Sequence, residues 1–342
     1  MPPSWRDERG TLQLERGCAG DCQILVTPIA FNGNFHLHYY PRLSALLAQL
    51  KPDILHIDEE PYNLATFLAL RAGQRIGART LFFSWQNLQR RYPPPFSWLE
   101  RYVIDHAQAC LAGNQAAELV WRAKGFRGPI AVIPQFGVEP DVFKPVQPRE
   151  PSTKFTVGYV GRLVEEKGVD VLLHALAQLD GDWRAELIGG GPAHGRLIDL
   201  TRQLQLADRV RFISWLPSAE IAGSYRTLDA FVLPSRSRTN WKEQFGRSLV
   251  EAMACGVPVI GSTCGEIPNV VGNAGLIFPE GDAAALCASL NRLRSDPGLR
   301  SDLAQRGRQR VLEHFTQAQV ARQTYEVYRQ MMRPEEKLRH ER

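Results

Sequence analysis

Two glutamates, Glu243 and Glu251, give the chain its strongest chemical signal, in the segment KEQFGRSLVEAMACGVPVIGS. A helix beginning near Phe245 would end at Cys255-Gly256, so Glu251 would lie within it and Glu243 in the loop before it. Carboxylates at these two places can accept hydrogen bonds from the paired hydroxyls of a polyol in one cleft. The alternative is that Glu243 caps the helix dipole and that Glu251 is a solvated helix residue.

Two cations, Arg162 and Lys167, lie in the segment GYVGRLVEEKGVDVLLHAL, where a strand would end at Gly161 and a helix would begin near Val169. Two positive side chains and the free N–H groups of a helix start are what a diphosphate needs. Both cations could instead be solvated surface residues. The glycine-rich turn LIGGGPAHG, which starts at Leu187, permits the close approach of a ligand or simply a tight turn.

These segments need a scaffold, and the chain alternates short apolar strands with longer amphipathic helices, as a parallel sheet covered on both faces does. The strands expected in the first half are DILHI, TLFFSW, ACLAG and IAVIP, with helices over residues 64–76, 96–106 and 116–124. The second half gives FTVGYVG, AELIGG, VRFISW, AFVLPS, PVIGS and GLIFP, and then two helical stretches over residues 297–332. The proline-rich run PVQPREPST between the halves is typical of a linker. The sequence therefore predicts an α/β fold of two Rossmann-like domains facing a cleft, with ligands beyond the carboxyl ends of the strands.

Composition narrows the class of protein. With 342 residues, 44% of them hydrophobic and 23% charged, the chain is typical of a globular protein of two domains. Its formal net charge of +5 is not clustered, which argues against a nucleic-acid partner. It has no apolar run of membrane-spanning length and no apolar leader, so a cytoplasmic location is expected. No metal site is expected, and the cysteines are interpreted as reduced thiols because they form no paired framework: Cys18, Cys22, Cys110, Cys255, Cys264 and Cys287.

Taken together, GRLVEEKG, GGGP, AFVLPS, the two glutamates and CGEIPNVVGNAGLIFPEGD resemble the donor domain of the group 1 glycosyltransferases, glycosyltransferase family 4, over most of residues 154–330. The resemblance implies a GT-B fold, a nucleotide-diphosphate sugar as donor and retention of configuration at the anomeric carbon. We expect an acceptor-side domain over residues 1–147, a donor domain over 154–315 and a C-terminal helix, 316–342, that packs back toward the first domain. Gln244, Asn269 and Ser214 depart from the family pattern.

The same resemblance implies roles for residues of the second half. Arg162 and Lys167 would neutralise the diphosphate and Glu243 would contact the donor sugar, and these three are the expected catalytic residues. Glu251 would hold the ribose hydroxyls, and the base would lie in the segment ISWLP. The expected donor-binding residues are Gly161, Trp215, Leu216, Phe245, Gly246 and Glu251.

The first half resembles acceptor-domain segments of some bacterial members, through KPDILHIDEEPYNLATFLA, RTLFFSWQNLQRRYPPPFSWLERYVI and PQFGVEPDVFKP. Its first apolar run, QILVTPIAF, is not followed by a glycine-rich turn, so we expect the opening βα unit to be missing and the chain to be truncated there. Where many members carry a histidine, this chain has Trp85-Gln86-Asn87. The candidates for holding acceptor hydroxyls, each with a turn or a helix cap as the alternative, are Glu59, Glu60, Gln86 and Asn87.

Other side chains of the first half have less specific interpretations. Arg90 and Arg91 suggest peripheral contact with anionic lipid at the inner face of a membrane. His56, inside an apolar strand, is expected in the core, whereas His36 and His38 alternate as in a strand and have no assigned role. An aromatic cluster could stack on a sugar or a lipid, although core packing is the commoner use of such residues: Trp85, Tyr92, Phe96 and Trp98.

The expected function is that of a retaining, metal-independent glycosyltransferase, as used in polysaccharide biosynthesis. It would move a sugar from a nucleotide-diphosphate donor to a hydroxyl of a saccharide, a lipid-linked saccharide or another glycan precursor. No cofactor is expected, because the nucleotide sugar is the substrate. Two alternatives stay open: a catalytically impaired protein that only binds nucleotide sugar, and a sugar phosphorylase or epimerase with the GT-B fold.

Overall fold

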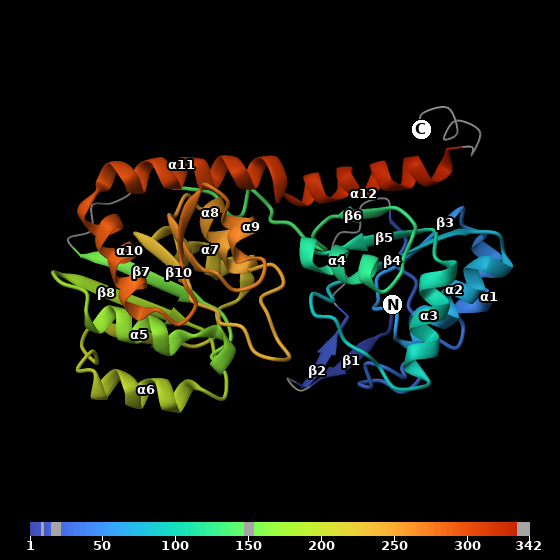
Figure 1. Ribbon diagram of the computed structural model, residues 1–342, viewed down its shortest axis with the longest axis horizontal. Helices are drawn as coiled ribbons and strands as arrows, with labels where there is room; N and C mark the ends of the chain where they lie inside the picture. The colour runs from blue at the N-terminus through green and yellow to red at the C-terminus, as the bar shows by residue number, and fades with distance from the viewer. Residues whose placement is uncertain (8–9, 15–21, 147–153, 334–342) are drawn as a thin grey trace. The chain divides into compact units, whose positions relative to one another are not determined.

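The computed structural model describes residues 1–7, 10–14, 22–146 and 154–333 (Figure 1). They form two compact units, one made of Met1–Ile133 with the chain from Thr324 onward, and one made of Pro134–Gln323. Most of the expected linker, and also Cys18, lie outside the described residues.

The division between the units falls after Ile133, whereas the sequence placed the end of the first domain at residue 147. Hydrogen bonds explain the difference, because side chains of the second unit hold the segment that follows Ile133. The guanidinium of Arg308 donates to the carbonyl of Phe143 at 2.6 Å, and that of Arg226 donates to the carbonyl of Val142 at 2.7 Å. This segment therefore packs as part of the second unit.

The first unit contains a parallel sheet with the strand order β3-β4-β5-β6. Its strands coincide with the four expected apolar runs: β3 (Ile54–Ile57), β4 (Arg79–Ser84), β5 (Ala109–Ala112) and β6 (Ile130–Val132). Its helices are α1 (Leu43–Leu50), α2 (Leu64–Arg75), α3 (Phe96–His106) and α4 (Gln115–Ala123). The core is formed by apolar side chains of strands and helices, among them Leu70, Phe82, Val103, Trp121 and Phe126.

The chain before this sheet contains a short antiparallel pair, β1 (Ser4–Asp7) with β2 (Gly10–Gln13), and the run QILVTPIAF forms no strand. The strand-like alternation of His36 and His38 is misleading, because His36 lies in a turn and His38 follows that turn without belonging to a strand. The side chain of Asn34 accepts hydrogen bonds from the backbone N–H groups of His36 and Leu37, at 3.1 and 3.0 Å. Backbone groups satisfied in this local way need no partner strand.

The second unit contains a six-stranded parallel sheet with the order β12-β11-β10-β7-β8-β9. The strand order reverses between β7 and β10, so the loops that follow these two strands border the place where such sheets bind ligands. All six strands coincide with expected runs: β7 (Phe155–Val160), β8 (Trp183–Ile188), β9 (Val210–Ile213), β10 (Ala230–Leu233), β11 (Val259–Ser262) and β12 (Gly275–Phe278).

Helices cover both faces of this sheet (Figure 1). They are α5 (Val169–Ala177), α6 (His194–Gln203), α7 (Ser218–Arg226), α8 (Arg247–Ala254), α9 (Ile267–Val271), α10 (Ala283–Ser295) and α11 (Pro297–His314), after which the chain continues into α12 (Gln317–Met332). Side-chain caps begin two of the long helices, since Asp282 and Asp296 accept hydrogen bonds from the N–H groups of Ala285 and Leu299, at 2.9 Å in each case.

The end of α12 belongs to the first unit, where it contacts strand β3 through one hydrogen bond. The hydroxyl of Tyr328 lies 2.7 Å from Nδ1 of His56. Burial lowers the pKa of His56, against the opposing charge of Asp58, so the neutral ring is favoured. His56 is therefore a hydrogen-bonded core residue, as its position inside an apolar strand predicts.

Candidate functional site

A hollow of about 700 Å³ opens in the second unit beyond the carboxyl ends of its strands. The loop after β7, the loop after β9 and the segment that leads into α8 supply most of its lining. We call it the donor hollow. Its lining includes eight of the residues that the sequence singled out: Gly161, Arg162, Lys167, Trp215, Leu216, Glu243, Gly246 and Glu251.

Lys167 and Glu243 form an ion pair at the wall of the donor hollow. The ammonium of Lys167 lies 2.6 Å from Oε2 of Glu243, and the hydroxyl of Ser235 donates to the same oxygen at 2.9 Å. Glu243 is only 7% exposed. Because Lys167 and Ser235 both lie outside α8, Glu243 does more than cap the dipole of that helix. A side chain at Gly265, where φ is +57°, would meet the carbonyl of Glu243 at 2.2 Å, so this turn needs glycine to hold the glutamate.

The segment between β10 and α8, which carries Glu243, also places Trp241 beside Lys167. The ammonium of Lys167 lies 5.2 Å from the ring centre of Trp241, a cation–π distance. Earlier in the same segment, the guanidinium of Arg236 donates to both carboxylate oxygens of Asp170, at 3.1 and 3.0 Å, and Arg238 pairs with Glu165. The segment is thereby tied to the turn that carries Lys167.

Glu251 lies inside α8, as predicted, but it is buried rather than solvated. The hydroxyl of Tyr225 donates to its Oε2 at 2.9 Å, and Nε of Arg247 donates to its Oε1 at 2.8 Å. Burial raises the pKa of Glu251, while these two donors and the charge of Arg247 oppose the rise. A carboxylate has about four lone-pair positions, so Glu251 keeps acceptor capacity toward the hollow.

The glycine-rich turn packs against backbone. A side chain at Gly189, where φ is +141°, would meet the carbonyl of Gly161 at 1.9 Å, and one at Gly191 would meet that of Leu163 at 2.5 Å. The N–H of Leu163 donates to the carbonyl of Gly190 at 2.9 Å. These glycines thus allow the turn to pack closely against the loop that carries Arg162. This packing accounts for the glycines without a bound ligand.

Other donor-side candidates have distinct surroundings. Trp215 is 61% exposed, so the face of its ring is available to a flat ligand. The ring of Phe245 is buried and makes edge contacts with Phe136 and Phe315, at centroid distances of 6.3 and 5.7 Å. Gly246 precedes the first residue of α8 with φ at +79°.

The acceptor-side candidates lie at the carboxyl ends of β3 and β4 in the first unit. Oε2 of Glu60 accepts from the hydroxyl of Ser84 at 2.6 Å, and Oε1 accepts from the N–H of Trp85 at 2.8 Å. Burial raises the pKa of Glu60 to about 7. Gln86 is buried and donates to the carbonyl of Leu88 at 3.1 Å. Glu60 thus joins the chain after β3 to the end of β4, whereas this bond of Gln86 stays within its own loop.

Glu59 pairs with a buried histidine that the sequence did not single out as a partner. Nδ1 of His38 lies 3.1 Å from the carbonyl oxygens of Asn34 and Phe35, and Nε2 lies 3.1 Å from Oε1 of Glu59. Both ring nitrogens face acceptors, so this geometry fits the doubly protonated ring. Burial opposes the charge of His38, but the hydrogen bond and negative charge of Glu59 outweigh it, and the pKa of His38 is raised.

The aromatic cluster of the first unit is mainly packing. Tyr92 stacks on Tyr62 with ring centres 4.1 Å apart, and Phe96 lies 5.1 Å from the ring of His36. Trp98 differs, because 69% of it is exposed.

Two other kinds of site are absent from the part of the chain that the structure describes. No described helix combines the length and the apolar character that crossing a bilayer requires. Nor do three or more histidine, cysteine, aspartate or glutamate side chains gather as metal ligands within residues 1–7, 10–14, 22–146 and 154–333.

Sequence reasoning missed four residues that contact charged side chains of the donor hollow: Ser235, Trp241, Tyr225 and Arg247. Ser235 and Trp241 had a detectable signal, because they flank the run that leads to Glu243. Tyr225 had none, since it reaches Glu251 from a different helix, 26 residues away.

Comparison with known proteins agrees with this architecture. A family model described as glycosyl transferases group 1 matches residues 143–310, and one described as a glycosyl transferase 4-like domain matches residues 8–135. The D-inositol 3-phosphate glycosyltransferase of Streptomyces bingchenggensis is 31% identical over 264 residues, which are 70% of this chain and 56% of that protein. The chain spans about half the length of the curated relatives it matches.

Solved structures agree on the fold. The sucrose-phosphate synthase of Thermosynechococcus elongatus is 26% identical with a TM-score of 0.67, over 84% of this chain and 75% of that one. HepE of Anabaena, solved in complex with UDP, is 20% identical with a TM-score of 0.72, over 85% of this chain and 82% of that one. These neighbours have the GT-B fold, which confirms the expected fold class. The chain therefore belongs to the group 1 glycosyltransferases of the GT4 type.

Proposed function

We propose that the chain binds a nucleotide-diphosphate sugar in the donor hollow and transfers the sugar to a hydroxyl acceptor with retention of anomeric configuration. One observation carries the proposal: Arg162 and Lys167 from one segment, and Glu243 and Glu251 from another, line the same hollow. Cations suit a diphosphate and carboxylates suit sugar hydroxyls, so this set matches both parts of such a donor.

The diphosphate would lie between Arg162 and Lys167, near the N-terminus of α5. Glycosyl transfer moves negative charge onto the leaving diphosphate while positive charge develops at the anomeric carbon. Fixed cations in a partly dry site stabilise that leaving charge. Lys167 is already oriented by Glu243 and Trp241, so it needs little reorganisation when the donor binds.

The sugar and the nucleoside would occupy opposite ends of the hollow. Glu243 would accept hydrogen bonds from hydroxyls of the donor sugar with its remaining lone pairs. Glu251 would accept hydrogen bonds from the ribose, and the exposed ring of Trp215 would stack on the base. Burial of Glu243 and Glu251 favours bound hydroxyls over water at these positions.

In the proposed reaction, the acceptor oxygen forms a bond to the anomeric carbon on the face from which the diphosphate leaves. The bond between that carbon and the diphosphate oxygen breaks, its electron pair goes to the diphosphate, and the acceptor proton goes to a phosphate oxygen. This balance needs no resident metal or cofactor. On the acceptor side, Glu59, Glu60, Gln86 and Asn87 are the candidates for holding acceptor hydroxyls.

UDP is the first probe for the nucleotide, since the Anabaena neighbour was solved with it. Thermal unfolding with UDP, GDP and ADP tests the binding step, and a ligand at 100 times its dissociation constant adds about 2.7 kcal/mol of stability. We expect one diphosphate to raise the melting temperature, and Lys167→Ala to remove the shift. The matched control is Lys154→Ala, which removes a lysine of the same unit from an exposed pair with Asp182. If no diphosphate shifts the melting temperature, or if the control loses the shift equally, the proposal fails.

Release of UDP from UDP-glucose then separates a transferase from a protein that only binds. Turnover that depends on an added hydroxyl compound supports transfer. Binding without any turnover, across a panel of saccharide acceptors, would support the impaired binder instead.

A further inference from the structure

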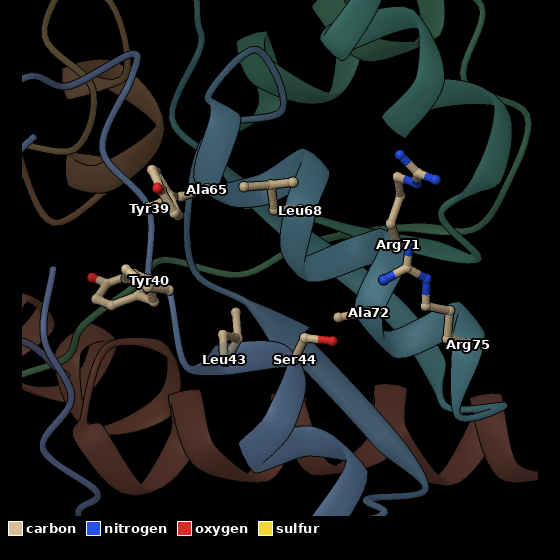
Figure 2. A pocket seen from close by; sticks show the side chains of 10 residues that line it. Tyr39, Tyr40, Leu43, Ser44, Ala65, Leu68, Arg71, Ala72 and Arg75 are labelled. Carbon is tan, nitrogen blue, oxygen red and sulfur yellow. The ribbon is translucent and has the colours of Figure 1, made fainter. Parts of the chain in front are cut away.

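A second hollow, of about 170 Å³, lies between helices α1 and α2 of the first unit (Figure 2). We call it the α1–α2 groove. Its floor is apolar, formed by Leu43, Ala65, Leu68 and Ala72. Its rim is polar, with Tyr39, Tyr40 and Ser44 on one side and Arg71 and Arg75 on the other.

The two arginines give the groove a positive end. Arg71 and Arg75 are one helical turn apart on α2, a spacing at which like charges destabilise a helix by a few tenths of a kcal/mol. Neither helix carries an acidic residue, and neither guanidinium pairs with a carboxylate anywhere in the described chain. The guanidinium of Arg71 lies 5.5 Å from the ring centre of Phe67, a contact that leaves its N–H donors unused. The positive end therefore has donors and charge to offer an anion.

The other end of the groove is less suited to an anion. Burial raises the pKa of Tyr40, and the negative charge of Glu59 raises it further. Glu59 thus acts on the tyrosine end, away from the arginines. The hydroxyls of Tyr39, Tyr40 and Ser44 make no hydrogen bond with any residue that the structure describes. They remain available to polar atoms of a ligand.

We propose that the α1–α2 groove binds a phosphate group attached to an apolar chain, with the phosphate at Arg71 and Arg75 and the chain along the apolar floor. Guanidinium groups match phosphate oxygens in geometry and charge. A cavity of about 150 Å³ holds a benzene ring, so this groove has room for a headgroup and the first few carbons of the chain. The site lies in the first unit and does not depend on the donor hollow.

Such a ligand has two possible sources, a free amphiphilic phosphate or the headgroup of a membrane lipid. Hexyl phosphate serves as the free probe, with inorganic phosphate and hexanol as its separate halves. Vesicles of phosphatidylcholine, with and without phosphatidylglycerol, serve as the lipid probe. Both measurements use the full chain without nucleotide, so their outcome is independent of the proposed transferase activity.

Three variants make the test specific. R71Q/R75Q removes the positive end, and Ser44→Phe fills the mouth of the groove from an exposed position on α1 while leaving the charge unchanged. The matched control, R101Q/R127Q, removes two exposed arginines of the same unit that do not line the groove. Thermal unfolding identifies any variant that fails to fold, and Ser44→Phe and R71Q/R75Q each test the proposal without the other.

We expect calorimetry to show that hexyl phosphate binds more tightly than inorganic phosphate or hexanol. The affinity should fall about tenfold or more in R71Q/R75Q and in Ser44→Phe, and should stay unchanged in the control. If both groove variants also lose binding to vesicles that contain phosphatidylglycerol, while the control keeps it, the ligand is a lipid headgroup. If binding to these vesicles is the same in the groove variants and in the unchanged protein, the ligand is a free amphiphilic phosphate. Equal binding of hexyl phosphate and hexanol, or an equal loss in R101Q/R127Q, would overturn the proposal.

Discussion

Two lysine–glutamate pairs, one in each unit, have the same chemistry but different surroundings. Lys167 pairs with Glu243 in the second unit, and Lys124 pairs with Glu100 in the first. In both pairs the lysine ammonium also lies over an aromatic ring. Lys167 and Glu243 line the donor hollow, whereas Lys124 and Glu100 have side chains that are 8% and 11% exposed and join the end of α4 to α3.

The difference lies in the donors that each lysine has left for a ligand. An ammonium group has three donors. Lys124 uses donors on Glu100 and on the side chain of Gln86, within packed protein. The ammonium of Lys167 has one hydrogen-bond partner, Glu243, among the residues described, and Lys167 lines a space that a ligand can fill. The Lys124–Glu100 pair is therefore expected to serve stability, whereas the proposed function assigns the Lys167–Glu243 pair to binding.

The sharpest test of the first half of this comparison is Lys124→Ala. Removing one partner of a buried pair leaves an uncompensated charge, at a cost of about 3–5 kcal/mol in the free energy of unfolding. Urea unfolding measures this loss. The double variant K124M/E100L removes both charges and should recover most of the stability, because apolar replacements of a buried pair are often neutral. A loss below about 1 kcal/mol in Lys124→Ala would contradict the assigned role.

Glu243→Gln tests the role of the Lys167–Glu243 pair. It keeps the size of the side chain but removes the charge that orients Lys167, so turnover should fall about 100-fold with little change in the free energy of unfolding. The measurement is UDP release from UDP-glucose in the presence of an acceptor. Glu220→Gln, an exposed glutamate on α7, is the matched control and should keep full turnover. A variant that unfolds more easily but turns over normally would make Glu243 a structural residue like Glu100.

Much of the scaffold of both sites could be predicted from the sequence, because it depends on local patterns. The apolar runs gave the strands of both parallel sheets, and the helix over Phe96–His106 was located to the residue. The run QILVTPIAF misled, since apolar residues alone do not provide a partner strand. The alternation of His36 and His38 after this run also wrongly indicated a strand, because the side chain of Asn34 accepts the hydrogen bonds of nearby backbone N–H groups.

Side-chain partners were harder to predict, because they come from distant parts of the chain. Lys124 and Glu100 are 24 residues apart, and His38 and Glu59 are 21 residues apart. No spacing rule connects residues on different elements. The motif-dense second half was the exception, because resemblance located Lys167 and Glu243 together before their contact was known.

Two histidines of the first unit sharpen the comparison by their opposite dependence on pH. The pKa of His38 is raised in the fold, so its contribution to stability is present below its ordinary value of 6.5 and is lost as pH rises through the raised value. The pKa of His56 is lowered, so its contribution is present above 6.5 and is lost as pH falls through the lowered value.

Urea unfolding of His38→Gln and His56→Gln over the range on both sides of pH 6.5 measures these two contributions. Relative to the unchanged protein, His38→Gln should lose more stability at low pH, and His56→Gln should lose more at high pH. Parallel stability curves for both variants would mean that neither ring changes its protonation as its contacts indicate.

The smallest expected effect is that of replacing Trp241, which tests whether this ring helps Glu243 to orient Lys167. Trp241 contacts its ammonium through the face of the indole ring, an interaction of about 0.5–1 kcal/mol at an exposed site. Trp241→Leu should therefore lower kcat about threefold while KM stays nearly constant, because the lysine is still present but less well oriented. Trp241→Phe keeps an aromatic face and should recover most of the loss. Since a general packing defect would not be rescued by a smaller ring, equal kcat values for the Leu and Phe variants would show that Glu243 alone positions the lysine.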